Sequence, residues 1–408
     1  MSTQKITMVI STYWGRSKKE GWHEGDKIYD HSTPIDEEGT ICRIIESIKI
    51  LKDKEFNLVI IACATHQKIS KEVEEKVCQK LKEIKIPVKT YFFSHSHLKD
   101  LKKKLLNLLA EGIVDLLSIY GYANIRNLCL LLPQLLGSEI ALLIDDDEIF
   151  EDNEFISKVK ENIGKTINNE FKKAIAGFYL QPNGSYFLEK KTGTWQTYWD
   201  NVTTMNLAFK KFIASSPRLK EVPFVFGGNM LVHRDLFTKV PFDPNITRGE
   251  DIYFLLNAKI FGYKFYLDNQ LAIKHLAPQK AHPVWRQIRE DICRFLYMRE
   301  KIRAINKDGK FFKIFPEYFD PYPGEFLKDN LEEKILYSNL MLALEYLNMQ
   351  EKEAALECLR NIQIAKYKAD SQFLPLEFLI DFQKRWEKLM FCVEAKRCKI
   401  IHCLEDLN

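Results

Sequence analysis

The stretch Ile140-Ala-Leu-Leu-Ile-Asp-Asp-Asp-Glu148 joins five apolar residues to four acidic ones. An apolar run without polar alternation predicts a strand buried on both faces, as in a parallel sheet. The acids would then follow the carboxyl end of that strand, where open α/β sheets bind ligands. Clustered carboxylates repel one another unless a cation neutralises them, and Mg²⁺ or Mn²⁺ prefers oxygen ligands. The alternative is that the acids cap the next helix or lie on a solvated turn.

The residues before this run alternate between apolar stretches typical of strands and amphipathic stretches typical of helices. We expect strands at 6–10, 56–62 and 88–93, helices at 41–51, 68–84 and 98–110, and a further helix that ends at about 136. A long polar loop is expected from Ser11 to Glu38. Repeated strand, helix and strand units predict an α/β fold in which helices cover a mostly parallel sheet.

The second half of the chain begins with the same mixture and becomes helical. We expect helices at 154–163 and 252–261 and strands at 174–180, 224–231, 263–267 and 271–273. From about Pro283 the pattern favours amphipathic helices, at 284–301, 331–348, 351–365 and 375–390. The predicted organisation is one large domain over 1–324, with halves at about 1–150 and 151–324, and a helical C-terminal subdomain over 325–408.

Composition excludes some classes of protein. A net charge of +4, from 60 basic and 56 acidic residues, gives no case for nucleic acid binding. The first eight residues lack the apolar core of a signal peptide, and polar residues interrupt the long apolar runs. Nine cysteines in core-like segments favour reduced thiols, so we expect a cytoplasmic protein without a transmembrane segment. One cluster, Cys392, Cys398, His402 and Cys403, lacks the paired spacing of structural zinc sites.

Several polar residues beside the expected strands are candidates for a site. Arg126 and Asn127 begin the helix that precedes the acidic run, where they can hold a phosphate or simply form a surface pair. Glu250 and Asp251 follow Arg248 and Gly249 at the start of a helix, where carboxylates also serve as caps. His275 follows the last expected strand, a position that is more often structural when taken alone. Trp195 lies in an aromatic-rich stretch that can stack on sugars or pack internally.

The order of these features resembles that of GT-A-fold (Rossmann-like) glycosyltransferases that use nucleotide sugars, specifically the family 2 type. The likeness covers about 5–300 and rests on a set of motifs in order: Asp145-Asp146-Asp147, Gly227-Gly228-Asn229, Glu250-Asp251 and His275. It implies a GT-A sheet, a UDP- or GDP-sugar donor, a carbohydrate or small hydroxylated acceptor, and Mg²⁺ or Mn²⁺ as the cofactor.

The resemblance also implies a role for each matching residue. Ser11, Thr12, Arg126, Asn127, Asp145 and Asp146 would contact the donor, and Asp147 and His275 would bind the metal. Asp251 would be the general base, with Glu250 beside it. The acceptor would meet Gly227, Gly228, Asn229, Trp195 and Arg248. The long insert at 13–38 departs from the family pattern, in which a short loop leads into the first helix, and it can cover the donor or shape the acceptor site.

Other functions fit parts of the same pattern. A related GT-A group that makes osmolytes from an activated sugar and a glycerate-type acceptor retains the anomeric configuration, and a protein that only binds a sugar nucleotide would share the aspartates. A nucleotidyltransferase is disfavoured because no glycine-rich phosphate loop with a lysine follows the first strand. The helical tail can cap the acceptor side or mediate a homodimer, and the sequence does not choose between them.

Overall fold

A computed structural model describes residues 4–189, 193–278, 282–369 and 374–407. It is built around one 11-stranded sheet in which nine strands follow the order β10-β12-β9-β11-β5-β1-β3-β4-β13, while β2 pairs with β1 and β6 with β12. The strands of this sheet are β1 (Ile6–Gly15), β2 (Thr33–Pro34), β3 (Asn57–Ala64), β4 (Thr90–Phe93), β5 (Ile140–Asp145), β6 (Glu148–Ile149), β9 (Ala174–Leu180), β10 (Leu219–Glu221), β11 (Asn229–His233), β12 (Tyr266–His275) and β13 (Glu405–Asp406). Strands β7 (Thr166–Ile167) and β8 (Glu170–Phe171) form a separate hairpin.

The central strands run as the apolar patterns predict. Strands β5, β1, β3 and β4 are parallel neighbours, and β9 is parallel to β12, whereas β11 lies antiparallel between β5 and β9. Side chains of β5 alternate between two buried layers, with Ala141 and Leu143 on one face and Leu142 and Ile144 on the other. Because both faces are covered, the strand carries no polar residue before its end. The predicted α/β fold with a mostly parallel sheet is confirmed.

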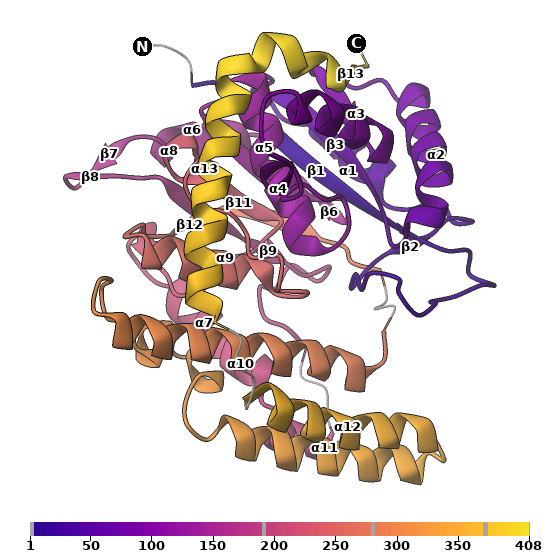
Figure 1. Cartoon of the computed structure of the whole chain (residues 1–408), viewed down its shortest axis with the longest axis vertical. Helices are drawn as coiled ribbons and strands as arrows, with labels where there is room; N and C mark the ends of the chain where they lie inside the picture. Colours follow the sequence, from indigo (N-terminus) through magenta and orange to yellow (C-terminus); the bar gives the residue numbers. More distant parts are fainter. Residues whose placement is uncertain (1–3, 190–192, 279–281, 370–373, 408) are drawn as a thin grey trace.

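Helices cover both faces of the sheet (Figure 1). They are α1 (Ile41–Ile48), α2 (Ser70–Glu83), α3 (His95–Leu106), α4 (Glu111–Val114), α5 (Tyr122–Leu136), α6 (Phe155–Asn162), α7 (Asn201–Phe212), α8 (Arg234–Phe237), α9 (Glu250–Ile260), α10 (Val284–Asp308), α11 (Leu331–Asn348), α12 (Lys352–Ala369) and α13 (Pro375–Ile400). Apolar residues of α1, α2 and α6 pack on one face, and those of α5, α9 and α13 belong to the layer on the other.

The C-terminal region is helical, as expected. Helices α11 and α12 pair with each other, and α12 packs on α10. In Figure 1 the yellow helix α13 leaves this pair and runs back along the body of the molecule, where it contacts α4 and α5. The chain then adds β13 beside β4 at the edge of the sheet. No helix in the described ranges is both long enough and apolar enough to cross a membrane.

Strand β1 is twice as long as the sequence predicts, so the expectation that a loop begins at Ser11 is wrong. Residues Ser11 to Gly15 stay in the sheet because Trp14 and Tyr13 bury their rings on opposite faces while the backbone pairs with β3 as far as Ala64. The hydroxyl groups of Ser11 and Thr12 find side-chain partners inside the protein. The polar residues Ser11 and Thr12 therefore belong to the strand. The irregular segment spans 16–38 and is interrupted by β2.

Other elements also differ from the expected ones, and three of them bear on the site or on the sheet. Strand β11 begins at Asn229, so Gly227 and Gly228 precede it and do not interrupt it. The two short strands expected after Tyr263 are one strand, β12, with a register shift between Leu267 and Ala272. Helix α7 was not predicted, because its Asn and Thr residues resemble a polar loop in sequence.

Candidate active site

The acids after β5 and the start of α9 meet at one place, joined by Arg126. Its guanidinium lies 2.9 Å from a carboxylate oxygen of Asp145 and donates from Nε to Oε1 of Glu250 at 3.2 Å. Arg126 is 3% exposed and Glu250 6%, so this pair is held away from water, whereas the side chain of Asp145 is partly exposed. In the described residues, Nη1 of Arg126 has no hydrogen-bond partner although it is buried. A buried N–H without a partner is costly, and an anionic ligand would satisfy it.

The start of α9 orients the second pair of acids. Gly249 has φ +70°, a backbone conformation that favours glycine, and it turns the chain into the helix. The carboxylate of Asp251 accepts hydrogen bonds from the backbone N–H groups of Gly227, at 3.1 Å, and Ile252, at 2.7 Å. Burial raises the pKa of Asp251, although these N–H donors and nearby arginines oppose the effect. Burial also raises the pKa of Glu250, to about 7, against the charge of Arg126.

The glycine pair fits tightly between these groups. A Cβ atom on Gly228 would lie 2.2 Å from Oε1 of Glu148 and 2.5 Å from Oδ2 of Asp145. One on Gly227 would lie 2.9 Å from Arg126 and 3.2 Å from Asp251. Glycine is therefore needed here because carboxylates and a guanidinium crowd the backbone.

Glu148, the last acid of the opening stretch, is completely buried. Its Oε2 accepts the backbone N–H of Asp145 at 3.1 Å, which closes the turn between β5 and β6. Burial raises the pKa of Glu148 well above its usual value, and the charges of Asp145 and Asp147 add to that effect. The residue holds the acidic turn in shape.

Asp146 points into the protein. Its Oδ2 accepts hydrogen bonds from the hydroxyls of Thr12, at 2.6 Å, and Thr40, at 2.8 Å, and Trp14 Nε1 donates to the Thr12 hydroxyl at 2.9 Å. Burial raises the pKa of Asp146 to about 7, and the charge of Asp147 adds to the effect. Ser11 Oγ is bonded to Tyr13 Oη at 2.9 Å. Of the residues expected at the donor, Thr12 and Asp146 thus join β1, the acidic turn and the start of α1, whereas the Ser11 hydroxyl is bonded within β1.

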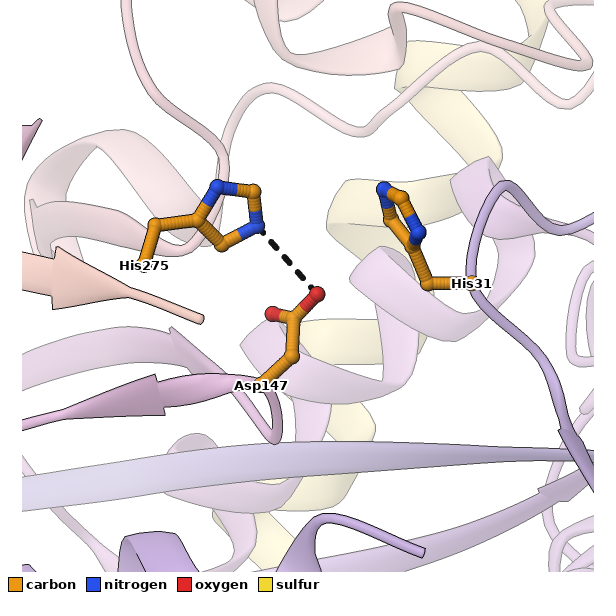
Figure 2. A group of neighbouring side chains, drawn as sticks. All are labelled: His31, Asp147 and His275. Atoms are coloured by element: carbon orange, nitrogen blue, oxygen red, sulfur yellow. Dashed lines mark hydrogen bonds and ion pairs between the residues drawn. The ribbon is translucent and has the colours of Figure 1, made fainter. Parts of the chain in front are cut away.

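Asp147 faces two histidines from distant parts of the chain (Figure 2). His275, the last residue of β12, lies with Nε2 at 3.2 Å from Oδ2 of Asp147. His31 comes from segment 16–38, and one ligand atom from each of the three residues lies within 4.8 Å of the others. Burial alone would raise the pKa of Asp147, but the hydrogen bond and charge of His275 outweigh it and lower the pKa. Tyr179 stacks on His275, with ring centroids 5.0 Å apart.

This trio fits a divalent cation. Ligand atoms around one ion at about 2.2 Å lie at most about 4.4 Å apart, so a small contraction brings all three to the metal. Metal ligands must be deprotonated, and an ion would replace the proton shared by His275 and Asp147. Mg²⁺ prefers oxygen atoms, and imidazole nitrogens are ligands of transition metals, so of the two expected ions this set favours Mn²⁺. Within the described ranges, the group of His, Cys, Asp or Glu side chains with metal-ligand geometry is His31, Asp147 and His275. Cys392, Cys398, His402 and Cys403 do not form such a group.

Four residues expected in the site are engaged elsewhere. Asn127 holds the backbone of Phe242 with both ends of its amide, at 2.9 and 2.8 Å. Asn229 is completely buried and donates to the carbonyl of Leu271 at 2.9 Å. Arg248 is paired with Asp30 and Asp291. Trp195 lies in a 3-10 turn, Thr194–Thr197, that packs against α11.

His31 was missed at the sequence level. His31 shares its polar segment with His23, nothing in the local pattern marks it as a metal ligand, and its partners Asp147 and His275 lie more than a hundred residues away. The only available signal was the presence of aromatic residues in a long loop, which argues against disorder.

No protein-family model matches the chain, and no curated protein matches it. Among solved structures the chain is similar to a mannosyltransferase from Pyrobaculum calidifontis in complex with GDP-Man and Mn²⁺, at 12% identity and a TM-score of 0.42, over 97% of this chain and 88% of that one. It is also similar to glucosyl-3-phosphoglycerate synthase from Mycobacterium tuberculosis in complex with Mg²⁺ and UDP, at 14% identity and a TM-score of 0.35, over 75% of this chain and 79% of that one.

Proposed function

We propose that the chain is a metal-dependent glycosyltransferase that moves a sugar from a UDP- or GDP-sugar to a hydroxyl acceptor with inversion. One observation carries the proposal: at the carboxyl edge of the sheet, Arg126 joins Asp145 to Glu250, with the trio His31, Asp147 and His275 following the same turn. Such an edge is where α/β sheets bind nucleotides.

The trio His31, Asp147 and His275 would hold the metal. A divalent cation bound there would act as a Lewis acid toward the diphosphate that leaves the sugar. The free Nη1 of Arg126 supports a contact with the same anion, because its other donors are taken by Asp145 and Glu250. Asp145 would then serve two purposes, since it fixes Arg126 and faces the donor.

Asp251 would take the proton of the acceptor hydroxyl as that hydroxyl attacks the sugar. Its two backbone donors fix the carboxylate, and burial raises its pKa toward the range in which a base works at neutral pH. Glu250, the neighbour of Asp251 in sequence, would hold Arg126 beside the donor and the base. The backbone at Gly227 and Gly228, kept bare by the crowding around it, would let the substrates approach.

The test is transfer by the purified full chain with Mn²⁺ and a panel of UDP-, GDP- and ADP-sugars against hydroxylated acceptors, followed by mass spectrometry of the products. Asp251→Asn is expected to lower kcat by about 10²- to 10⁴-fold, the usual contribution of a general base. Asp381→Asn, which changes an exposed acid on α13, serves as the control and should leave kcat unchanged.

The configuration of the product decides the mechanism. An inverted anomer by NMR supports the base role of Asp251, and a retained one overturns it and favours the osmolyte-type alternative. Tight binding of sugar nucleotides with no transfer to any acceptor would overturn the proposal that the chain is an enzyme. It would favour a protein that only binds a sugar nucleotide.

A further inference from the structure

Segment 16–38 is not a loose loop, because contacts fix it on both sides of His31. Before it, Tyr29 is completely buried, its ring lies 4.7 Å from that of Tyr13, and its hydroxyl accepts the N–H of Gly121 at 2.9 Å. After it, β2 pairs with the end of β1. His31 thus lies in a short stretch whose two ends, Tyr29 and β2, are fixed by contacts.

Asp30, the residue next to His31, makes a further contact that reaches the other half of the fold. Its carboxylate accepts hydrogen bonds from Nε of Arg248, at 3.1 Å, and from Nη2, at 3.1 Å. Its backbone N–H donates to the hydroxyl of Tyr122 at 2.6 Å. Both the backbone and the side chain of Asp30 are therefore fixed, which limits where the adjacent His31 can lie.

Arg248 is itself held in place. Its Nη1 donates to Asp291 on α10 at 2.9 Å, and the same carboxylate oxygen accepts from Nε of Arg294 at 2.9 Å. Arg248 lies two residues before Glu250, in the turn that opens α9. The ion pair therefore joins the residue beside a metal-ligand candidate to the turn that carries the acids of α9.

We propose that the Asp30–Arg248 ion pair is a positioning element of the metal site: it holds His31 against Asp147 and His275 so that the chain binds a divalent cation before any nucleotide arrives. This inference rests on the metal site of the proposed function. Three ligands from the chain, with one of them fixed by a second contact, form a site that needs no phosphate oxygen to gain affinity.

The test is Mn²⁺ binding to the purified full chain without nucleotide, measured from the electron paramagnetic resonance signal of free Mn²⁺. Asp30→Asn and Arg248→Gln are each expected to raise the Kd about tenfold, the lower end of the effect of residues that support metal ligands. Arg248→Lys keeps the charge but loses the planar fork, so its Kd should lie between those of the wild type and Arg248→Gln. In Asp30→Asn the ion pair between Arg248 and Asp291 remains, so we expect this variant to fold and to report on the metal site alone.

The opposite charges of the two residues separate positioning from simple electrostatics. If only net charge mattered, removing the cation would strengthen Mn²⁺ binding and removing the anion would weaken it. Positioning predicts that both changes weaken it. Lys18→Gln is the matched control, because it removes one positive charge from an exposed ion pair of the same segment, with Glu37, and should leave the Kd unchanged.

The outcomes distinguish this inference from the function on which it rests. A wild-type chain that binds Mn²⁺ with a Kd insensitive to Asp30→Asn and Arg248→Gln overturns the positioning role alone. Binding that appears only with UDP or GDP overturns the order of binding while the metal site stands. A chain that binds no Mn²⁺ even with a nucleotide overturns both the inference and the metal dependence of the proposed function.

Discussion

At the scale of single residues, Gly228 is the position where one added carbon should do most harm. The new Cβ of Gly228→Ala would overlap Oε1 of Glu148 and Oδ2 of Asp145, and Glu148 is held by the turn that it closes. Overpacking of this kind costs about 1 to 3 kcal/mol. We expect Gly228→Ala to lower the free energy of unfolding by that amount in urea titrations.

Gly112→Ala is the matched control for that substitution. Gly112 lies in helix α4, and a Cβ there has nothing within 4 Å. Alanine is the better helix former by about 0.5 to 1 kcal/mol, so this change should stabilise the chain slightly. Equal effects of the two substitutions would contradict the crowding at Gly228.

Glu250 should make stability depend on pH. Burial raises its pKa from 4.5 to about 7, in spite of the charge of Arg126. Between these two values the folded chain binds more protons than the unfolded chain, so this contribution to stability is present at low pH and is lost as the pH rises through the window. Each unit of pKa corresponds to 1.36 kcal/mol, so a shift from 4.5 to about 7 sets the effect at about 3 kcal/mol.

The measurement compares wild type with Glu250→Gln. Free energies of unfolding at about pH 5 and about pH 8 give a difference for each protein, and we expect the difference to be smaller in Glu250→Gln because glutamine does not titrate. An unchanged difference would mean that Glu250 titrates alike in the folded and unfolded chains. Using differences removes the part of the effect of Glu250→Gln that does not depend on pH.

At the scale of elements, α13 is a structural part of the sheet domain. The ring of Trp386 is completely buried, and its Nε1 donates to the carbonyl of Phe237 at 2.9 Å. Gln134 on α5 donates to the carbonyl of Met390 at 3.3 Å. The helix thus covers α5, the helix that carries Arg126 into the site.

Trp386→Ala should therefore destabilise the whole chain, by about 3 to 5 kcal/mol, since it removes a large buried ring and leaves a cavity. Phe391→Ala on the same helix is the control, because Phe391 is 74% exposed and its loss should change the free energy of unfolding by less than about 0.5 kcal/mol. Thermal unfolding that splits into two transitions in Trp386→Ala, with the first confined to the C-terminal helices, would contradict a single cooperative unit.

At the scale of the whole molecule, a metal that binds three distant segments should stabilise the fold. His31, Asp147 and His275 come together only in the folded chain, so an ion that binds them shifts the equilibrium away from the unfolded state. Mn²⁺ at a hundred times its Kd should add about 2.7 kcal/mol. We expect the Tm to rise with Mn²⁺, to fall again on chelation, and to stay unchanged in Asp147→Asn. A rise in Asp147→Asn equal to that of wild type would place the ion elsewhere.

The sequence by itself determined the central strands and the chemistry at their ends. The run Ile140–Ile144 has to be buried because contact of five consecutive apolar side chains with water is unfavourable, and the four acids therefore gather at the carboxyl end of the strand. The helix that follows Gly249 and the order of strands and helices could also be predicted, because they depend on local patterns of apolar and polar residues. The candidate residues Asp145, Asp147, Glu250, Asp251 and His275 followed from those patterns together with the family resemblance.

Only the tertiary structure decided which of these residues meet and which residues support them. Ser11 and Thr12 look like the start of a loop, yet strand pairing and buried partners keep them in β1. Asn127 binds the backbone of Phe242, whereas His31 lies beside Asp147 because contacts of its neighbours fix it there. Interactions between residues a hundred or more positions apart depend on how elements pack, and no local pattern in one sequence encodes them.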